Sequence, residues 1–164
     1  MSCYDDLSDY TYHGSAFWRP GTKNVGWLGL SKDFERAQPT CEILDALWRF
    51  CKVSVAQMRG VHECEFCSDG HVRNSERNGE QLLLGTSEIR VFGSDGSIYA
   101  APTLIYHYVE KHEYKPPEEF LEALAKGPTP PSPDYFDRLR SMGLEWNLTS
   151  TLAVGAVPYK IDRD

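Results

Sequence analysis

Apolar positions along the chain change their spacing from one region to the next, and each spacing predicts a different element. The clearest run repeats every three to four positions and consists of Ile43, Leu44, Leu47, Trp48 and Cys51. This is the spacing of one face of an α-helix. Thr40, just before the run, has a hydroxyl that can cap the first turn. We therefore predict an amphipathic helix from Thr40 to about Lys52.

Alternation of polar and apolar residues predicts a strand in the middle of the chain. Residues 88–91 (EIRV) alternate as expected for a strand that is buried on one face. The dipeptide Asp95-Gly96 is typical of a tight hairpin turn. Residues 97–100 are then expected to return as the partner strand, so this region predicts a β-hairpin.

Prolines and acidic residues indicate where the following helices begin and end. Pro102 suits the first turn of a helix, where the N–H that proline lacks would have no partner. Pro116 is expected to end that helix, because the residue before a proline avoids helical angles. Pro117 with Glu118 and Glu119 predicts the start of another helix, since carboxylates are favoured at the positive end of its dipole.

The remaining segments of the first two thirds of the chain predict less regular structure. Residues 1–30 combine many aromatic residues with turn formers, which favours loops and short strands, one of them at residues 24–28. The aromatic residues could line a ligand pocket, although such residues more often fill a core. Residues 68–79 are polar and predict an exposed loop.

Composition and charge restrict the partners of the chain more than its fold. Hydrophobic residues make up 41% of the sequence and charged residues 25%, as in ordinary globular proteins. The formal charge is -7 and no basic run occurs, which argues against a nucleic-acid partner. An acidic surface instead suits a basic protein partner. No stretch has the length of a membrane span, so we expect no membrane association.

The cysteines and the N-terminal residues favour a reducing compartment. Residues 1–12 are acidic and polar, unlike a secretory signal, so we expect a cytoplasmic protein. The chain has five cysteines, an odd number that is incompatible with a complete disulfide framework. Disulfides are also rare in the cytosol. We therefore interpret Cys64 and Cys67 as thiolate ligands rather than as a disulfide.

A metal-ligand pattern runs through the centre of the chain. Cys64 and Cys67 form a C-x-x-C pair, and His107 and His112 follow on the predicted helix. Closed structural zinc sites commonly take two ligands from a tight turn and two from a helix. We therefore predict a structural zinc site held by these four residues. The order of knuckle, hairpin and helix resembles a treble-clef unit.

The spacing of the two histidines leaves alternatives open. An offset of five residues separates their directions on a helix by about 140°. One ion can reach both only if the last helical turn loosens, which Pro116 would allow. His62 is the alternative ligand in place of one histidine. Without a metal, the histidines would be ordinary core residues and the two cysteines a chance pair or a redox pair.

Motifs of catalysis are absent from the sequence, and no catalytic residue is predicted. There is no H-E-x-x-H motif, and His62-Glu63-Cys64 does not complete the zinc-deaminase pattern. A nucleophile elbow, a P-loop and a dinucleotide-binding fingerprint are also missing. Four protein ligands would leave no position on the metal for a reacting water. A closed, structural site is therefore the preferred interpretation.

Together these elements predict an α+β fold with a small antiparallel sheet and three or four helices. A chain of 164 residues suits one ordinary domain. We expect a single zinc-stabilised domain at residues 1–126 and a proline-rich linker at residues 127–133. Residues 134–164 are expected to form a C-terminal extension that packs on the body. Within it we predict a short helix at residues 135–142 and a strand at residues 152–157.

Several motifs resemble those of a family of small, uncharacterised bacterial proteins. They are D-L-S-x-Y-x-Y at residues 6–12, N-V-G-W-L at residues 24–28, H-x-C-x-x-C at residues 62–67, E-I-R-V at residues 88–91 and Y-A-A-P-x-L-I-x-H-Y-V-x-x-H-x-Y-x-P-P-E-E-F at residues 99–120. The resemblance covers most of residues 4–126. It implies a bacterial source, and it implies no function, because none is known for the family.

Two hypotheses of function follow from these observations. The first is a non-catalytic, cytosolic, zinc-stabilised protein-binding module, such as an immunity or antitoxin-like protein that neutralises a basic toxin or effector. Small size, acidity, aromatic content and the lack of catalytic motifs favour it. The alternative is an enzyme of unknown reaction, with a pocket near the N-terminal aromatic residues and the His/Cys cluster.

Overall fold

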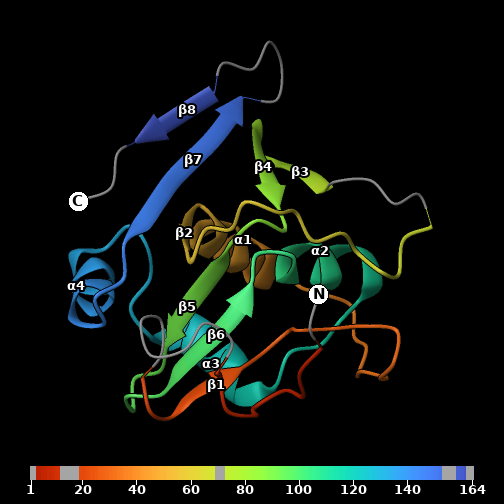
Figure 1. The fold of residues 1–164 in the computed structure, drawn as a ribbon, viewed down its shortest axis with the longest axis horizontal. Helices are drawn as coiled ribbons and strands as arrows, with labels where there is room; N and C mark the ends of the chain where they lie inside the picture. The colour runs from red at the N-terminus through yellow and green to blue at the C-terminus, as the bar shows by residue number, and fades with distance from the viewer. Residues whose placement is uncertain (1–2, 12–18, 69–72, 153–157, 162–164) are drawn as a thin grey trace.

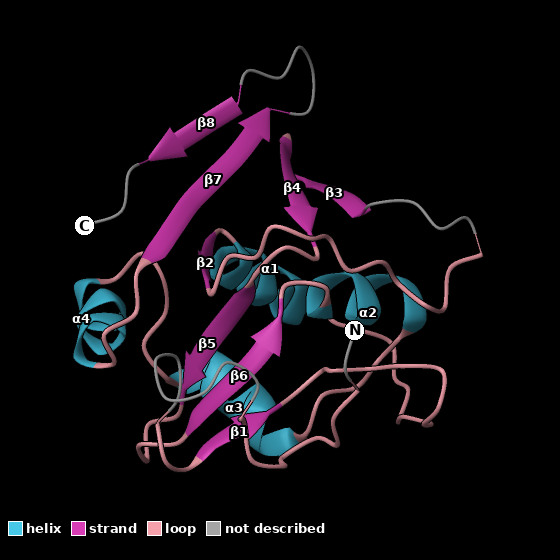
Figure 2. Cartoon of the chain, in the orientation of Figure 1, coloured by secondary structure: helices cyan, strands magenta, loops and turns pink. Residues whose placement is uncertain are grey.

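The computed structural model describes residues 3–11, 19–68, 73–152 and 158–161. In these residues the chain forms four helices and one eight-stranded sheet, which confirms the predicted α+β class (Figures 1 and 2). The helices are α1 (Cys41–Cys51), α2 (Ile105–His112), α3 (Glu118–Lys126) and α4 (Pro133–Ser141). The strands are β1 (Thr22–Asn24), β2 (Val53–Val55), β3 (Arg73–Arg77), β4 (Glu80–Leu84), β5 (Glu88–Phe92), β6 (Ile98–Pro102), β7 (Trp146–Leu152) and β8 (Pro158–Ile161).

The sheet is almost entirely antiparallel. Its strands follow the order β1-β6-β5-β2-β7-β4-β3, and β8 pairs with β7 outside this path. Only the pair of β1 and β6 is parallel among the described strands. β7 comes late in the chain but lies between β2 and β4, so residues after the proline-rich segment belong to the same sheet as the centre of the chain.

The helices that lie next to the sheet cover one of its faces. α1 and α3 pack on β5, and α2 packs beside α1 (Figure 1). α1 begins as predicted, because the Thr40 hydroxyl accepts a hydrogen bond from the Ile43 N–H at 3.2 Å. Its apolar face joins Ile89 and Val91 of β5 in the main core. The predicted amphipathic helix is therefore confirmed in both position and orientation.

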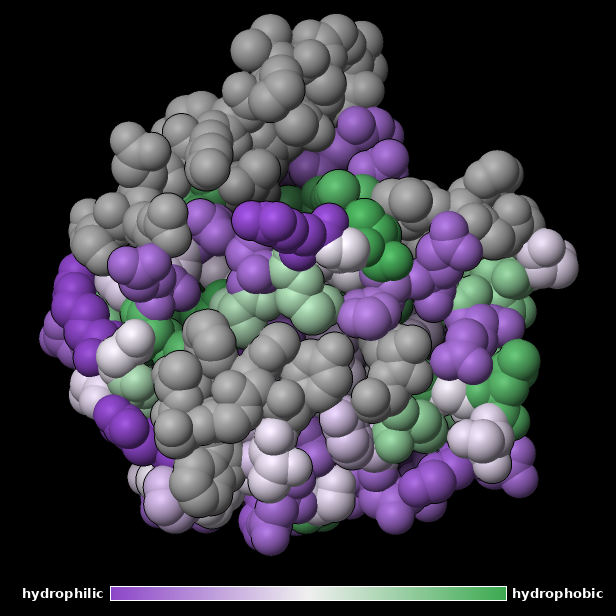
Figure 3. All heavy atoms as spheres, viewed as in Figure 1, coloured by the Kyte–Doolittle hydropathy of each residue, from purple (hydrophilic) through white to green (hydrophobic). Residues whose placement is uncertain are grey.

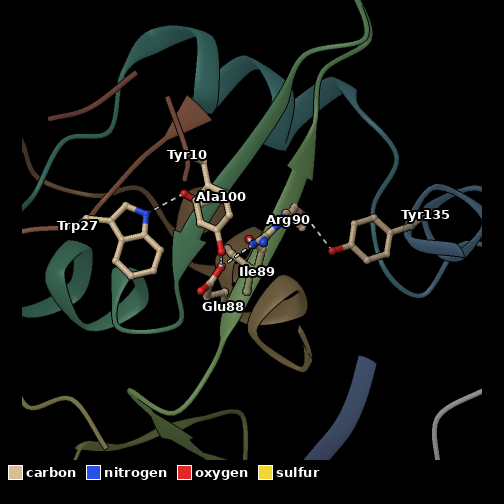
Figure 4. A network of polar contacts seen from close by, with 7 residues as sticks. All are labelled: Tyr10, Trp27, Glu88, Ile89, Arg90, Ala100 and Tyr135. Carbon is tan, nitrogen blue, oxygen red and sulfur yellow. Dashed lines mark hydrogen bonds and ion pairs between the residues drawn. The ribbon is translucent and has the colours of Figure 1, made fainter. Parts of the chain in front are cut away.

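The opposite face of β5 is also buried, which corrects the prediction of a half-buried strand. Glu88 and Arg90 are both fully buried and form an ion pair of 2.8 Å (Figure 4). The N-terminal segment covers this face, where the Tyr10 hydroxyl donates to Glu88 at 2.8 Å and the Arg90 guanidinium lies 4.7 Å from the Tyr10 ring centroid. Trp27 closes the same face by donating to the Ala100 carbonyl at 3.0 Å. The two charges are tolerated inside because they neutralise each other.

Other predicted boundaries are wrong for identifiable reasons. Pro102 is the last residue of β6, opposite Glu88, and does not begin α2. At the end of a strand, the missing N–H of a proline removes no hydrogen bond from the middle of the ladder. α2 ends at His112, before Pro116, because Glu113 takes a left-handed backbone with φ 56°. The strand expected at residues 24–28 is β1, which ends at Asn24.

The polar segment at residues 68–79 is not simply a loop. Part of it is β3, which pairs in register with β4, so that Arg73 lies opposite Leu84 and Arg77 opposite Glu80. Asn78 and Gly79, both with positive φ, connect the two strands. The polar composition of the segment gave no signal for this hairpin. β3 is the last strand in the order of the sheet, and such a strand needs few apolar side chains.

The C-terminal residues pack on the sheet through α4 and β7. Ser132 caps α4 by accepting from the Tyr135 N–H, and Tyr135 donates its hydroxyl to the Arg90 carbonyl at 2.7 Å (Figure 4). The helix predicted at residues 135–142 is thereby confirmed. Of the strand predicted at residues 152–157, Leu152 is the last residue of β7 and residues 153–157 lie outside the described residues.

One face of the described surface is mainly hydrophilic. Figure 3 shows polar residues across most of the coloured face, with separate hydrophobic patches between them. The large apolar side chains that are exposed are Leu30, Val61 and Leu83. Within the described ranges, none of the helices combines the length and the apolar character that a membrane crossing requires.

Candidate metal centre

The two halves of the predicted ligand set come together in space. Cys64 and Cys67 lie on the segment between β2 and β3, and His107 and His112 lie on α2. Their ligand atoms all lie within 4.8 Å of one another. These four residues are therefore close enough together to hold one metal ion.

Three sulfur–nitrogen distances in the cluster are close to those of a tetrahedral site. Nε2 of His112 lies 3.3 Å from Sγ of Cys64 and 3.4 Å from Sγ of Cys67, and Nε2 of His107 lies 3.4 Å from Sγ of Cys67. A tetrahedral ion with sulfur at about 2.3 Å and nitrogen at about 2.0–2.1 Å places these two kinds of ligand about 3.5 Å apart. These three pairs of ligand atoms are thus spaced as they would be around one ion.

The last turn of α2 brings His107 and His112 together despite their five-residue spacing. The Glu113 N–H bonds to the Tyr108 carbonyl five residues back, and the Tyr114 N–H bonds to the same carbonyl at 3.1 Å. An α-helix spans four residues with each such bond, so this last turn is widened. The imidazole ring centroids of His107 and His112 are consequently only 5.1 Å apart. The left-handed Glu113 comes directly after this widened turn.

Two of the four cluster residues are buried, and the other two are partly buried. Cys64 and His107 are only 3% and 4% exposed, and the Phe66 ring packs edge-on against Tyr108 and beside His112. Burial raises the pKa of the Cys64 thiol to about 11. A bound metal would have to displace this proton, so we expect metal affinity to fall as the pH is lowered.

His62 has a backbone role instead of a ligand role. It does not belong to the group of four, and its N–H donates to the Gly85 carbonyl at 2.8 Å. The Gly85 N–H in turn donates to the Thr103 hydroxyl at 3.0 Å. Gly85, between β4 and β5, therefore ties the segment that leads to the two cysteines to the segment before α2. Sequence reasoning did not identify this position.

Replacing Gly85 with alanine should damage the metal centre through the backbone. Gly85 has φ +99°, and an added Cβ would lie 2.3 Å from the His62 carbonyl oxygen. Because backbone atoms must move, we expect a loss of at least about 2 kcal/mol of stability together with weaker metal binding. Urea unfolding and a chelator competition titration measure the two effects.

Gly79 provides the matched control for this substitution. It also has a positive φ, of +80°, but an added Cβ would meet no atom within 4 Å. Gly79→Ala should cost only the backbone strain, about 1 kcal/mol, and leave metal affinity unchanged. Equal effects of the two substitutions on metal binding would contradict the role assigned to Gly85.

The treble-clef comparison is not confirmed by the arrangement of the chain. Two hairpins, β3–β4 and β5–β6, lie between the cysteine pair and α2. The helical ligands come from the third and the last residue of α2. The order of cysteine turn, hairpin and helix is present, but the site is built on a larger sheet.

The fold and the cluster define an α+β protein with a four-residue Cys/His group that can hold a metal ion. The model of a family described as a domain of unknown function (DUF7919) matches residues 2–125. The chain belongs to this family, and the resemblance to an uncharacterised family is confirmed. All four cluster residues lie inside the matched region. No curated protein and no solved structure matches the chain.

Proposed function

We propose that the cluster binds zinc and that the ion supports the fold rather than catalysis. Two thiolates and two imidazoles are a donor set that suits zinc. The two pairs of ligands lie 40 or more residues apart in the sequence, so an ion would join the cysteine segment to α2. Four protein donors around one zinc ion would leave no position for substrate or water.

We further propose that the protein is a non-catalytic, cytosolic binding module for a basic protein partner, such as a toxin or effector. The formal charge of -7 supports a basic partner. The cysteines of the cluster must stay reduced to bind metal, which suits the cytosol. The observation that carries the proposal is the closed ligand set. A closed metal site stabilises the fold and does not take part in a reaction.

Native mass spectrometry tests the proposal most directly. The tagged protein is purified gently, without chelator, from the organism that encodes it. One zinc ion and a stoichiometric basic protein would support a binding module. One zinc ion with a small-molecule adduct and no protein would favour the enzyme alternative, and a metal-free mass would contradict the zinc site.

One observation favours the alternative of an enzyme. A cavity of about 350 Å³ lies among the N-terminal residues, with Tyr4 and Trp27 in its wall. Cavities of this size can hold small ligands. A solvent molecule on the metal, or turnover of a compound bound in the cavity, would decide for the enzyme.

A further inference from the structure

Residues 34–38 lie beside the end of α2 and contain none of the four metal ligands. Two backbone hydrogen bonds, each of 2.9 Å, join them to residues 113–115, which follow α2 directly. Arg36 and Tyr114 lie opposite each other in an antiparallel bridge. The 34–38 segment therefore fixes the direction in which the chain leaves His112.

The Arg36 side chain caps the end of α2. Its Nη1 donates to the His112 carbonyl at 2.7 Å. His112 is the last residue of α2, and the last carbonyls of a helix have no partner within the helix. A cationic donor is favoured at this position by the hydrogen bond and by the negative end of the helix dipole. Arg36 thus holds the backbone of a residue whose side chain belongs to the candidate metal centre.

The same segment also contacts the half of the cluster that contains the cysteines. The guanidinium carbon of Arg36 lies 4.3 Å from the centroid of the Phe34 ring. Phe34 packs edge-on against Phe66, which lies between the two cysteines, and their ring centroids are 5.4 Å apart. Phe66 in turn lies beside the His112 ring, with 5.5 Å between centroids. One short segment therefore touches both halves of the cluster.

We infer that Arg36 is a positioning residue of the metal centre, which holds the last turn of α2 so that the His112 imidazole reaches the same ion as the other three ligands. On an ideal helix, the directions of His107 and His112 would differ by about 140°. Without the Arg36 donor, we expect the widened turn to relax and His112 to leave the ion. The inference rests on the proposed metal site and extends it to a residue that is not a ligand.

The test uses the whole chain loaded with Co²⁺ in place of zinc, because the visible spectrum of Co²⁺ reports its coordination. Tetrahedral Co²⁺ absorbs visible light much more strongly than Co²⁺ with five or six ligands. Arg36→Met removes the donor and keeps a long apolar side chain beside the Phe34 ring. We expect its Co²⁺ absorption to fall as water replaces His112. Its zinc affinity, measured by chelator competition, should fall by about tenfold or more, as is common for residues that orient metal ligands.

A conservative variant and a matched control separate positioning from general stability. Arg36→Lys should recover part of the absorption and of the affinity, because an ammonium group can also donate to the carbonyl at a helix end. Arg49→Met is the control, since Arg49 is an exposed arginine in the last turn of α1. It should leave the spectrum and the zinc affinity unchanged.

Arg36 is exposed, so we expect Arg36→Met to fold, which circular dichroism checks. If it does not fold, Arg36→Gln, with a side chain too short for the same hydrogen bond, takes its place with the same expectation. A lower Tm alone would be compatible with any structural role of Arg36. The spectrum and the affinity of the folded variant therefore decide.

The outcomes distinguish the inference from the proposed function. A wild-type protein without the absorption of tetrahedral Co²⁺ would contradict the metal centre and the inference together. A tetrahedral wild-type spectrum that Arg36→Met leaves unchanged, with unchanged zinc affinity, would overturn the inference alone. Equal losses in Arg36→Met and Arg49→Met would also overturn it, because they would show a general effect of removing positive charge.

Discussion

Cys67→Ser should remove bound metal and strongly destabilise the protein. Cys67 is the cluster residue whose sulfur lies 3.4 Å from Nε2 of both histidines. Its substitution therefore removes the sulfur that lies next to both imidazoles. Serine replaces a soft thiolate with a hydroxyl that binds zinc poorly. Because metal binding contributes directly to folding, we expect a loss of at least about 3 kcal/mol, which corresponds to a fall in Tm on the order of 10 °C.

The measurement is metal content together with a thermal melt, and Cys41→Ser is the control. Cys41 is exposed at the start of α1 and lies outside the cluster. The same chemical change there should leave both metal content and Tm within the error of the wild type. A Cys67→Ser protein that keeps its metal and its Tm would show that the cluster is not the metal site.

Arg90→Met should have the second largest effect. The substitution would leave the Glu88 carboxylate fully buried without the guanidinium that lies 2.8 Å away (Figure 4). Breaking a buried ion pair by removing one partner costs about 3–5 kcal/mol, because a buried charge then has no counter-ion. Methionine fills a similar volume, so lost packing contributes less than the lost charge. Urea unfolding of the metal-loaded protein measures the change.

A double variant separates the charge effect from packing. If the penalty comes from the loss of the guanidinium beside the Glu88 carboxylate, Glu88→Leu combined with Arg90→Met should be more stable than Arg90→Met alone. Lys126→Met is the surface control, because its partner Glu122 and Lys126 itself are both more than 60% exposed. Its cost should stay below about 0.5 kcal/mol. A double variant that is as unstable as the sum of its single variants would argue for packing instead.

The elements that were predicted correctly are those whose signals are local. The helix after Thr40 has its cap and its apolar stripe within twelve residues, so local signals were enough to predict it. The four residues of the cluster were identified by residue type and spacing, because few residue types can hold zinc, and zinc binding itself stays a prediction. The C-x-x-C pair and the two histidines of α2 could therefore be assigned to one site, although two hairpins lie between them.

The features that could not be predicted depend on contacts between distant segments. Burial of Glu88 and Arg90 requires Tyr10, which lies 78 residues before Glu88. Alternation along β5 indicates which side chains share a face but does not indicate what covers that face. The widened last turn of α2 brings His112 close to His107, and the residue that follows it, the left-handed Glu113, is not the glycine or asparagine that would have indicated this helix end. Because of this widened turn, His107 and His112 lie close enough to reach one ion, although their five-residue spacing would separate them on an ideal helix.

X-ray absorption spectroscopy at the zinc edge of the purified, chelator-free protein tests the central claim most directly. It reports the identity of the metal, the number of its ligands and their distances in one experiment. We predict one zinc ion with two sulfur ligands at about 2.3 Å and two nitrogen ligands at about 2.0–2.1 Å, without a fifth ligand. A protein without zinc, or a zinc ion with an oxygen ligand in place of one of the four residues, would contradict a closed structural centre.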